Sequence, residues 1–416
     1  MAINVIDEAK RCLNCKKPLC RTGCPINTPI PQMISMFLNG EITDAGEMVF
    51  ENNPLSLVCS LICNHESQCQ GHCILNRKGA PIDIGSIEHY ISDNYFTKTR
   101  LVAKEKNGIK AAVIGSGPAG LTIAILLAER GYDITVFESK DKIGGVLRYG
   151  IQEFRLPKSI LDRYQTQLKS LGIKIRPNTA IGKTIVFDDL FRDGYKAISI
   201  GTGVWWPNTL HIKGETLGNV HYAIHYLVNP DVYDLGETVN IIGAGNAAMD
   251  VARTVIRQGS RNVTIFSRTE TYAASRVEAE MARIDGVKFV YNKSAVEITD
   301  EGVIFQNVVC DENENVVEYL GNNTLYKADS TIISVSQGPS SLIPNKTEGL
   351  QTNKRGLVVV NPEGVTDIPG VFASGDVVRG AKTVVEAVAN SKKVADAMDE
   401  YLQKEYLSKK QEQRRT

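Results

Sequence analysis

The fold is decided by KAAVIGSGPAG, residues 110–120, in which an apolar strand leads into a glycine-rich turn. Gly115, Gly117 and Gly120 have the spacing G-x-G-x-x-G. At the start of a βαβ unit, such glycines allow a tight turn, close approach of the backbone to a pyrophosphate, and packing of the helix on the strand. The sequence predicts that helix and a second strand over residues 121–138, so this segment opens a dinucleotide-binding fold.

An acidic residue supports the same interpretation. Glu138 ends the predicted second strand, 23 residues after Gly115, where a carboxylate is placed to hydrogen-bond an adenosine ribose. The alternative is a glycine-rich packing turn that holds no ligand. The residues predicted to form this first nucleotide site are Gly115, Gly117, Pro118, Ala119, Gly120 and Glu138.

A second copy of the unit begins 128 residues later, with the strand VNIIG at 239–243 and the turn GAGNAA at 243–248. Its second strand is predicted to end in Ser267 and Arg268, where an NAD site usually has a carboxylate. An arginine pairs with a 2′-phosphate that a carboxylate would repel, so Arg268 and Arg276 favour NADP, with NAD as a second choice. The alternative is a solvated surface arginine. The residues predicted from the turn itself are Gly243, Gly245 and Ala248.

Two nucleotide sites of different character fit one flavin and one pyridine nucleotide. We therefore assign the acid-terminated first site to FAD and the arginine-terminated second site to NADP. A C-terminal strand at 370–373 is followed by Gly375 and Asp376, whose carboxylate is placed for the ribityl or pyrophosphate part of FAD. A helix that begins near Thr383 then approaches the flavin ring with its N-terminus. The FAD domain is thus predicted to be discontinuous, with the NADP domain inserted in it.

Eight of the nine cysteines precede position 74, and Cys310 stands alone. They form C-x2-C-x4-C-x3-C-P from Cys12 to Cys24 and C-x3-C-x5-C-x3-C from Cys59 to Cys73. A structural zinc site commonly uses two C-x2-C pairs, which these spacings fit poorly, so iron–sulfur clusters are favoured and zinc is the alternative. The nucleotide-binding segments contain no C-x-x-C, so electrons are expected to leave the flavin through the clusters.

Length, composition and charge limit the classes of protein to which the chain can belong. The 416 residues include 47 basic and 47 acidic side chains, so no net charge attracts the chain to nucleic acid or to an anionic membrane. No apolar run is long enough to span a bilayer and the N-terminus does not resemble a signal peptide, so a cytoplasmic protein is expected.

The predicted fold class is α/β, with a mostly helical iron–sulfur domain followed by two Rossmann-like domains. Its expected boundaries are 1–107 for the helical domain, 108–235 and 337–405 for the FAD domain, 236–336 for the NAD(P) domain and 406–416 for a tail.

Nearly the whole chain resembles the FAD- and iron–sulfur-containing NAD(P)H oxidoreductases. This family is typified by the small subunit of glutamate synthase, the N-terminal half of dihydropyrimidine dehydrogenase and the large subunit of NADH-dependent ferredoxin:NADP oxidoreductase. The x3, x5, x3 cysteine spacing and FRLPK are closer to the dihydropyrimidine dehydrogenase branch than to the usual glutamate synthase form. The motifs that carry the resemblance are the cysteine array, GSGPAG, GGVLRYGIQEFRLPK at 144–158, GAGNAAMD at 243–250 and GVFASGDVVRGAKTVVEAVANSKKVA at 370–395.

The resemblance implies two 4Fe-4S clusters, the second with one ligand that is not cysteine. That ligand is a glutamine in dihydropyrimidine dehydrogenase, and the matching residue here is Glu88. Its carboxylate is expected to lower the cluster's reduction potential through its negative charge. The alternative for Glu88 is an exposed helix residue, and Cys59 is left over as a buried thiol. The implied ligands are Cys12, Cys15, Cys20 and Cys73 for one cluster, and Cys24, Cys63, Cys69 and Glu88 for the other.

The resemblance also implies positions around both nucleotides. It places Arg155 near the flavin, although a surface salt-bridge residue is the alternative, and a strand cap is the alternative for Gln337. The implied contacts are Gly145 and Val146 with the FAD phosphates, Asn246 and Ala247 with the NADP pyrophosphate, and Gln337 and Gly338 with the nicotinamide.

The implied reaction is hydride transfer from NADPH, or as a second choice NADH, to FAD, followed by single-electron transfer through both clusters to another protein. Direct hydride transfer requires no protein acid or base, so no catalytic side chain is assigned. The expected acceptor is a pyrimidine-reducing subunit, then a glutamate synthase large subunit, then ferredoxin. From another class, the alternative is a non-catalytic NADP-binding scaffold whose cysteines hold zinc.

Overall fold

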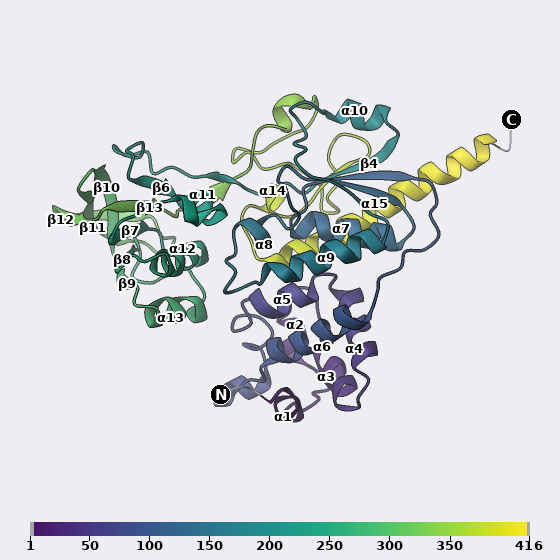
Figure 1. The fold of residues 1–416 in the computed structure, drawn as a ribbon, viewed down its shortest axis with the longest axis horizontal. Helices are drawn as coiled ribbons and strands as arrows, with labels where there is room; N and C mark the ends of the chain where they lie inside the picture. Colours follow the sequence, from purple (N-terminus) through teal and green to yellow (C-terminus); the bar gives the residue numbers. More distant parts are fainter. Residues whose placement is uncertain (1–3, 414–416) are drawn as a thin grey trace. The chain divides into compact units, whose positions relative to one another are not determined.

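The computed structural model describes residues 4–413, without the side chains of residues 405, 406 and 408–413 (Figure 1). The chain divides into two compact units. The first unit contains Met1–Arg148, Glu153–Val204 and Pro339–Thr416, and the second contains Tyr149–Gln152 and Trp205–Gly338.

The N-terminal part of the first unit is helical, and no strand occurs between residues 4 and 98. Its helices enclose an apolar core that includes Met33, Val49, Ile87 and Ile91, all fully buried. Because the helices are short, most of the clustered cysteines lie in the loops between them. The elements are α1 (Val5–Lys10), α2 (Leu19–Thr22), α3 (Ile30–Leu38), α4 (Ile42–Asn52), α5 (Ser56–Ile62), η1 (Ile74–Lys78) and α6 (Ile84–Lys98).

A five-stranded parallel sheet lies at the centre of the first unit, in the order β15-β4-β1-β2-β3. In its register, Ala111 of β1 pairs with Ile134 on one side and Ala197 on the other. Strand β15 comes from the C-terminal segment and pairs with β4, so residues that follow the second unit complete this sheet. This arrangement agrees with the predicted fold class. The strands are β1 (Lys110–Ile114), β2 (Asp133–Phe137), β3 (Lys174–Arg176), β4 (Tyr195–Ile200) and β15 (Val371–Ala373).

Two long helices pack together beside this sheet. Helix α7 (Pro118–Glu129) follows the glycine-rich turn, and α15 (Val384–Gln413) lies against it (Figure 1). Arg130 joins them through ion pairs with Asp396 at 2.5 Å and Asp399 at 3.1 Å. Among the described residues, none of the helices has both the length and the apolar content that a bilayer span requires. The remaining helices of this unit are α8 (Val146–Tyr149), α9 (Lys158–Ser170), α10 (Phe187–Arg192), η3 (Pro344–Lys346) and α14 (Asp376–Arg379).

The helical domain docks on α9 of the same unit. Arg163 of α9 forms an ion pair with Asp93 of α6, with an N–O distance of 2.5 Å. The ring of Tyr164 lies 4.6 Å from that of Phe96, and the Gln167 side chain accepts from Leu101 N at 2.9 Å and donates to Thr99 O at 2.8 Å. These contacts, part apolar and part polar, explain why the helical domain and the first sheet form one compact unit.

The second unit has its own five-stranded parallel sheet, in the order β6-β13-β7-β8-β9. Between β9 and β13 the chain forms a three-stranded antiparallel sheet, in the order β10-β11-β12. It packs through Phe305, whose ring stacks on Phe266 with 4.1 Å between the ring centroids. The antiparallel sheet was not predicted from the sequence. The elements are β5 (Trp206–Pro207), β6 (Val220–Tyr222), α11 (Ala223–Val228), η2 (Pro230–Val232), β7 (Thr238–Ile242), α12 (Asn246–Arg257), β8 (Asn262–Phe266), α13 (Arg276–Ile284), β9 (Lys288–Val290), β10 (Lys293–Thr299), β11 (Gly302–Cys310), β12 (Val316–Lys327), β13 (Ser330–Ile333) and β14 (Gln337–Gly338).

The compact units of the structure do not coincide with the expected domain boundaries, since the second unit also contains Tyr149–Gln152 and ends at Gly338 rather than 336. The second unit begins at Trp205 rather than 236, because β6 pairs with β13 and β5 pairs with β14. The C-terminal helix continues to Gln413, so residues 406–413 of the expected tail extend α15, and 414–416 lie outside the described residues.

Candidate cofactor sites

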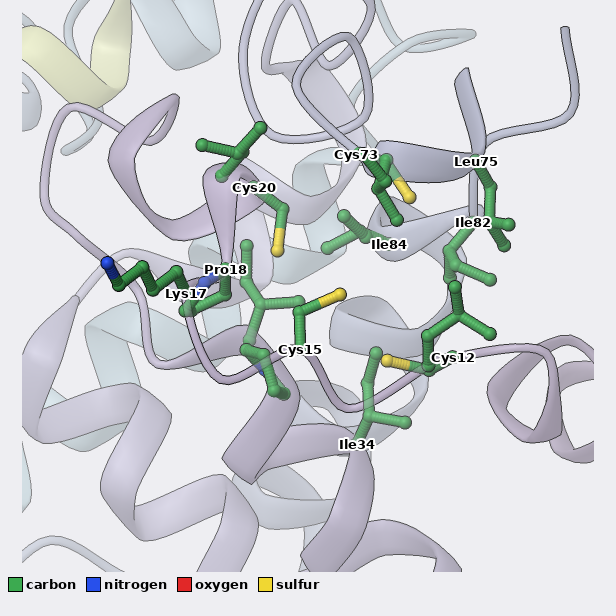
Figure 2. A pocket seen from close by; sticks show the side chains of 15 residues that line it. Cys12, Cys15, Lys17, Pro18, Cys20, Ile34, Cys73, Leu75, Ile82 and Ile84 are labelled. Carbon is green, nitrogen blue, oxygen red and sulfur yellow. The ribbon is translucent and has the colours of Figure 1, made fainter. Parts of the chain in front are cut away.

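Four cysteines line one cavity of about 230 Å³ in the helical domain (Figure 2). Cys12 and Cys15 come from the loop after α1, Cys20 from α2, and Cys73 from the residue before η1. Figure 2 shows their sulfur atoms turned toward the same space. The apolar side chains that complete the wall are Leu13, Pro18, Leu19, Ile30, Pro31, Ile34, Ile74, Leu75, Ile82 and Ile84.

The thiols of this cavity affect one another electrostatically. Burial, and then the neighbouring Cys73, raise the pKa of the Cys20 thiol to about 11. Burial also raises the pKa of Cys12, with smaller contributions from Cys15 and Cys73. Four soft sulfur donors in a mostly apolar pocket are a suitable ligand set for an iron–sulfur cluster. Within residues 4–413, no group of three His, Cys, Asp or Glu side chains is arranged to hold a single metal ion.

A second group of cysteines includes two, Cys63 and Cys69, that lie near Glu88 of α6. This carboxyl group is 7 % exposed, so the alternative of an exposed helix residue does not hold, and burial raises its pKa to about 8. Burial, followed by the neighbouring Glu88 and Cys24, raises the pKa of the Cys69 thiol. A hydrogen bond with Cys59, together with burial and Glu88, raises the pKa of Cys63. The structure thus places Cys63 and Cys69 near Glu88 and places Cys24 near Cys69, and it leaves Cys59 buried beside Cys63.

The first glycine-rich turn has the geometry that a pyrophosphate requires. Gly115 has φ +94°, and a Cβ atom there would lie 2.6 Å from Gly201 O. A Cβ atom on Gly120 would lie 1.9 Å from Gly115 O, so this position brings α7 close to the strand. At Gly117 a Cβ atom would meet only Gly145 Cα, at 4.0 Å, so this position is open where the helix N-terminus presents its free N–H groups.

Glu138 stabilises the same turn. Its carboxylate accepts hydrogen bonds from Ser116 N at 2.9 Å, from Ser116 Oγ at 2.5 Å and from Lys140 N at 2.8 Å. The side chain is 4 % exposed and lies at the end of β2, where it was predicted. Ser116 was not among the predicted site residues, although it stands inside the quoted motif.

The loop at 143–146 packs over this turn. Gly144 N donates to Ser116 O at 3.0 Å, and a Cβ atom on Gly145 would lie 2.7 Å from Gly117 Cα. Val146 begins α8. Arg155 lies half-buried in the segment between α8 and α9.

The C-terminal segment also lies against the first glycine-rich turn. Gly375 N donates to Asn390 Oδ1 at 3.1 Å, and a Cβ atom on Gly375 would lie 2.7 Å from the Cβ of Ala119. Burial raises the pKa of Asp376, the first residue of α14, to about 7.

Thr383 caps the start of α15 in a reciprocal pair with Glu386. Its hydroxyl donates to Glu386 Oε2 at 2.6 Å and accepts from Glu386 N at 3.4 Å, while Thr383 N donates to the same carboxylate at 3.0 Å. The sequence carries a signal for this capping box, TVVE at 383–386. The cap orders the N-terminus of α15, close in sequence to Asp376.

The second glycine-rich turn repeats the geometry of the first. Gly243 has φ +111°, and a Cβ atom there would lie 2.2 Å from Ser334 O. A Cβ atom on Gly245 would meet nothing within 4 Å, so the backbone is open there. Asn246 begins α12 and its Oδ1 accepts from Ser275 N at 2.8 Å; Ala247 follows it, and Ala248 is fully buried.

The two arginines predicted to bind the 2′-phosphate lie between β8 and the start of α13. Arg268 is exposed in the loop after β8, and its carbonyl oxygen accepts from Cys310 Sγ at 3.4 Å. Arg276 is the first residue of α13 and lies 3.4 Å from Glu280. Gln337 and Gly338 form β14. Both turns therefore fit a dinucleotide.

Comparison with known proteins gives two family matches. Residues 109–391 match the family described as pyridine nucleotide-disulphide oxidoreductase. Residues 2–100 match a family described as dihydropyrimidine dehydrogenase domain II, 4Fe-4S cluster.

Individual proteins match along nearly the whole chain. The small chain of glutamate synthase [NADPH] from Escherichia coli K12 is 31% identical over 95% of this chain and 91% of its own length. The NAD-dependent dihydropyrimidine dehydrogenase subunit PreT from the same strain is 32% identical over 96% of this chain and 94% of its own. Among solved structures, Mycobacterium tuberculosis FprA in complex with NADPH shares the fold, with a TM-score of 0.61, 18% identity and coverage of 72% of this chain and 85% of that one.

Proposed function

The chain belongs to the pyridine nucleotide-disulphide oxidoreductase family, and on that premise we propose that it passes electrons from NADPH to a separate acceptor protein. It is an FAD- and iron–sulfur-dependent NAD(P)H oxidoreductase of the glutamate synthase small chain and PreT type. When bound, FAD would supply a hydride acceptor for the nicotinamide, and 4Fe-4S clusters would supply one-electron carriers toward the acceptor. The chain's own residues bind and orient these groups.

The observation that carries the proposal is the set of partly buried cysteines, together with the buried Glu88, in the unit that also holds the first glycine-rich turn. Cys12, Cys15, Cys20 and Cys73 would hold one cluster. The other would be held by Cys24 from the loop after α2, Cys63 and Cys69 from the loop after α5, and Glu88 from α6.

Flavin binding follows from the arrangement around Gly117. Its open backbone and the N-terminus of α7 would hold the pyrophosphate, and Glu138 would keep the turn in place while it contacts the ribose. Gly145 and Val146 would line the phosphates, Arg155 would lie near the ring, and Asp376 and Thr383 would contact the ribityl chain and the ring from α14 and α15.

NADPH is the proposed electron donor. No carboxylate stands at the end of β8, and the exposed Arg268 and Arg276 would pair with the 2′-phosphate. Asn246 and Ala247 would face the pyrophosphate, and Gln337 and Gly338 the nicotinamide. The names of the two relatives differ in the nucleotide, since the glutamate synthase small chain is named for NADPH and PreT for NAD.

The proposed acceptor is a pyrimidine-reducing subunit, with a glutamate synthase large subunit and then ferredoxin as alternatives. The match of residues 2–100 to dihydropyrimidine dehydrogenase domain II supports the first choice, whereas the similarities to PreT and to the glutamate synthase small chain are nearly equal. The cytoplasm is the proposed compartment, because clustered thiols stay reduced there. Neither nucleic acid nor membrane is a proposed partner, since the net charge is zero.

Anaerobic purification tests the proposal. We expect a coloured protein that contains FAD, iron and acid-labile sulfide, and that NADPH bleaches in a stopped-flow experiment faster than NADH does. A colourless protein with bound zinc and no flavin would refute the redox function and favour the scaffold. Adding candidate acceptors to the NADPH-reduced protein, first a pyrimidine-reducing subunit with uracil and then ferredoxin, distinguishes the partners by which one reoxidises it.

A further inference from the structure

Three consecutive residues of α15 connect the first nucleotide site to the helical domain. Asn390 Oδ1 accepts from Gly375 N at 3.1 Å, and Ser391 Oγ donates to the hydroxyl of Ser374 at 3.1 Å. Lys392 Nζ points to the helical domain and donates to two oxygens of Asn52, the last residue of α4. It lies 2.5 Å from the backbone carbonyl oxygen and 3.4 Å from Oδ1 of the side-chain amide. One turn of helix thus binds both the strand end next to Asp376 and the helical domain.

A line of hydrogen bonds continues from Asn52 to a proposed cluster ligand. Asn52 Nδ2 donates to Thr28 Oγ1 at 3.3 Å, and Thr28 Oγ1 lies 3.3 Å from Cys24 Sγ. Because the Thr28 hydroxyl already accepts from Asn52, its own proton is available to the sulfur. A deprotonated Cys24 only accepts, so every donor in the line is directed toward that sulfur. Thr28 is 3 % exposed, which keeps this end of the line away from water.

The positive charge at the other end of the line is also close enough to Cys24 to interact with it. Burial lowers the pKa of the Lys392 ammonium, and the negative charges of Asp396 and Cys24 oppose that effect. Lys393, the next residue, is exposed and provides a matched control of equal charge.

We propose that the line Lys392–Asn52–Thr28–Cys24 raises the reduction potential of the cluster bound by Cys24, which makes Lys392 and Thr28 positioning residues for electron transfer. Hydrogen bonds to a ligand sulfur and a nearby cation stabilise the reduced, more negative cluster. The line opposes the Glu88 carboxylate, which lowers the same potential. The inference rests on the proposed function, because it takes Cys24 as a cluster ligand.

Redox titration of the holoprotein, followed by EPR spectroscopy under anaerobic conditions, tests the inference. Lys392→Met removes the charge and the first donor, and Thr28→Val removes the last donor with little change of shape. Each is expected to shift one cluster signal to lower potential and to leave the other cluster signal unchanged. The double variant is expected to shift that signal by less than the sum of the two, because both changes interrupt one line. Lys392→Arg is expected to restore most of the wild-type potential, and Lys393→Met to change neither signal.

The outcomes separate the inference from the proposed function. A wild-type protein without flavin or cluster signals refutes both. Wild-type signals that keep their potentials in Lys392→Met and in Thr28→Val overturn the inference alone. A lowered melting temperature with unchanged potentials also overturns it, since that result assigns Lys392 a purely structural role. If Lys392→Met does not fold, the buried Thr28→Val decides, because that change leaves the contact between α15 and α4 in place.

Discussion

The hydroxyl of Ser116, inside the first glycine-rich turn, donates a 2.5 Å hydrogen bond to the carboxylate of Glu138 at the end of the neighbouring strand. Ser116 is fully buried and Glu138 nearly so. The backbone N–H of Ser116 donates to the same oxygen at 2.9 Å. The carboxylate therefore organises the turn in addition to the role toward the ribose that its position predicts.

Replacing Ser116 with alanine is expected to weaken FAD binding. The change removes one charge-assisted hydrogen bond of about 1.5–3 kcal/mol and loosens the turn around Gly117. We expect the Kd for FAD to rise by about 10-fold or more, measured by flavin fluorescence during reconstitution of deflavinated protein. Ser139→Ala is the control, because the exposed Ser139 hydroxyl donates to the same carboxylate at 3.2 Å. Equal affinities for FAD in both variants and the wild type would contradict this role of Ser116.

Removing Glu88 is expected to release one cluster, whereas removing Cys59 is not. Glu88→Ala and Cys63→Ser each delete a proposed ligand of the second cluster, so iron and acid-labile sulfide are expected to fall to about half of the wild-type content. Cys59→Ser removes a thiol that is only 2 % exposed and hydrogen-bonds Cys63, yet stands outside the ligand set. Anaerobic metal and sulfide analysis of the three variants checks this. Loss of a cluster in Cys59→Ser, with both clusters retained in Glu88→Ala, would show that Cys59 is the ligand and Glu88 is not.

The predictable parts of the fold are those that local sequence patterns specify. Gly115 and Glu138 lie 23 residues apart within one βαβ unit, and the backbone requirements of that unit specify the residue types. The division of the cysteines into two groups could not be predicted from their spacing, because Cys73, from the second cysteine motif, lines the same cavity as Cys12 from the first. Only the resemblance to a family supplied that grouping.

The parts that were not predictable depend on contacts between distant segments. Strand β12 is exposed along most of its length, so VVEYLGNNTLYK has no regular alternation to mark the strand, and the antiparallel sheet was missed. Lys392 and Asn52 are 340 residues apart, and only the folded chain brings them together. The start of the second unit at Trp205 was missed because it depends on strands of two and three residues pairing with β14 and β13.

Arg268→Ala is expected to change the preference between NADPH and NADH. A bidentate arginine–phosphate pair contributes about 1.5–3 kcal/mol, so kcat/KM for NADPH is expected to fall by about 10-fold or more, with kcat/KM for NADH unchanged. The measurement is steady-state reduction of an artificial acceptor with each nucleotide. Arg261→Ala, at an exposed position just before β8, is the control for loss of a surface charge. An unchanged ratio in Arg268→Ala would assign the 2′-phosphate to another residue, and Arg276→Ala is then the next variant.

The contact between α7 and the helical domain is expected to make stability depend on pH. Burial, followed by the nearby Glu51 of α4, raises the pKa of Glu129 from an ordinary value of 4.5 to about 7. Because the pKa is higher in the folded protein, the folded state binds more protons than the unfolded state between about pH 4.5 and pH 7. The free energy of unfolding therefore decreases as the pH rises through this window. The other titratable groups near Glu129 are Tyr95 of α6 and Arg130. Arg130 is itself paired with Asp396 and Asp399 of α15.

Glu129→Gln is expected to remove this pH dependence. The amide stays neutral, so the variant is expected to be more stable than the wild type at pH 8 by about 1–2 kcal/mol, after allowance for partial exposure of the side chain. The difference is expected to shrink steadily toward pH 5, where Glu129 of the folded protein is protonated. Urea midpoints of the holoprotein measured from pH 5 to pH 8 check this, with the exposed Glu105→Gln as control. A stability gain that is the same at every pH would show that the amide improves packing, and that the carboxyl group does not titrate in this window.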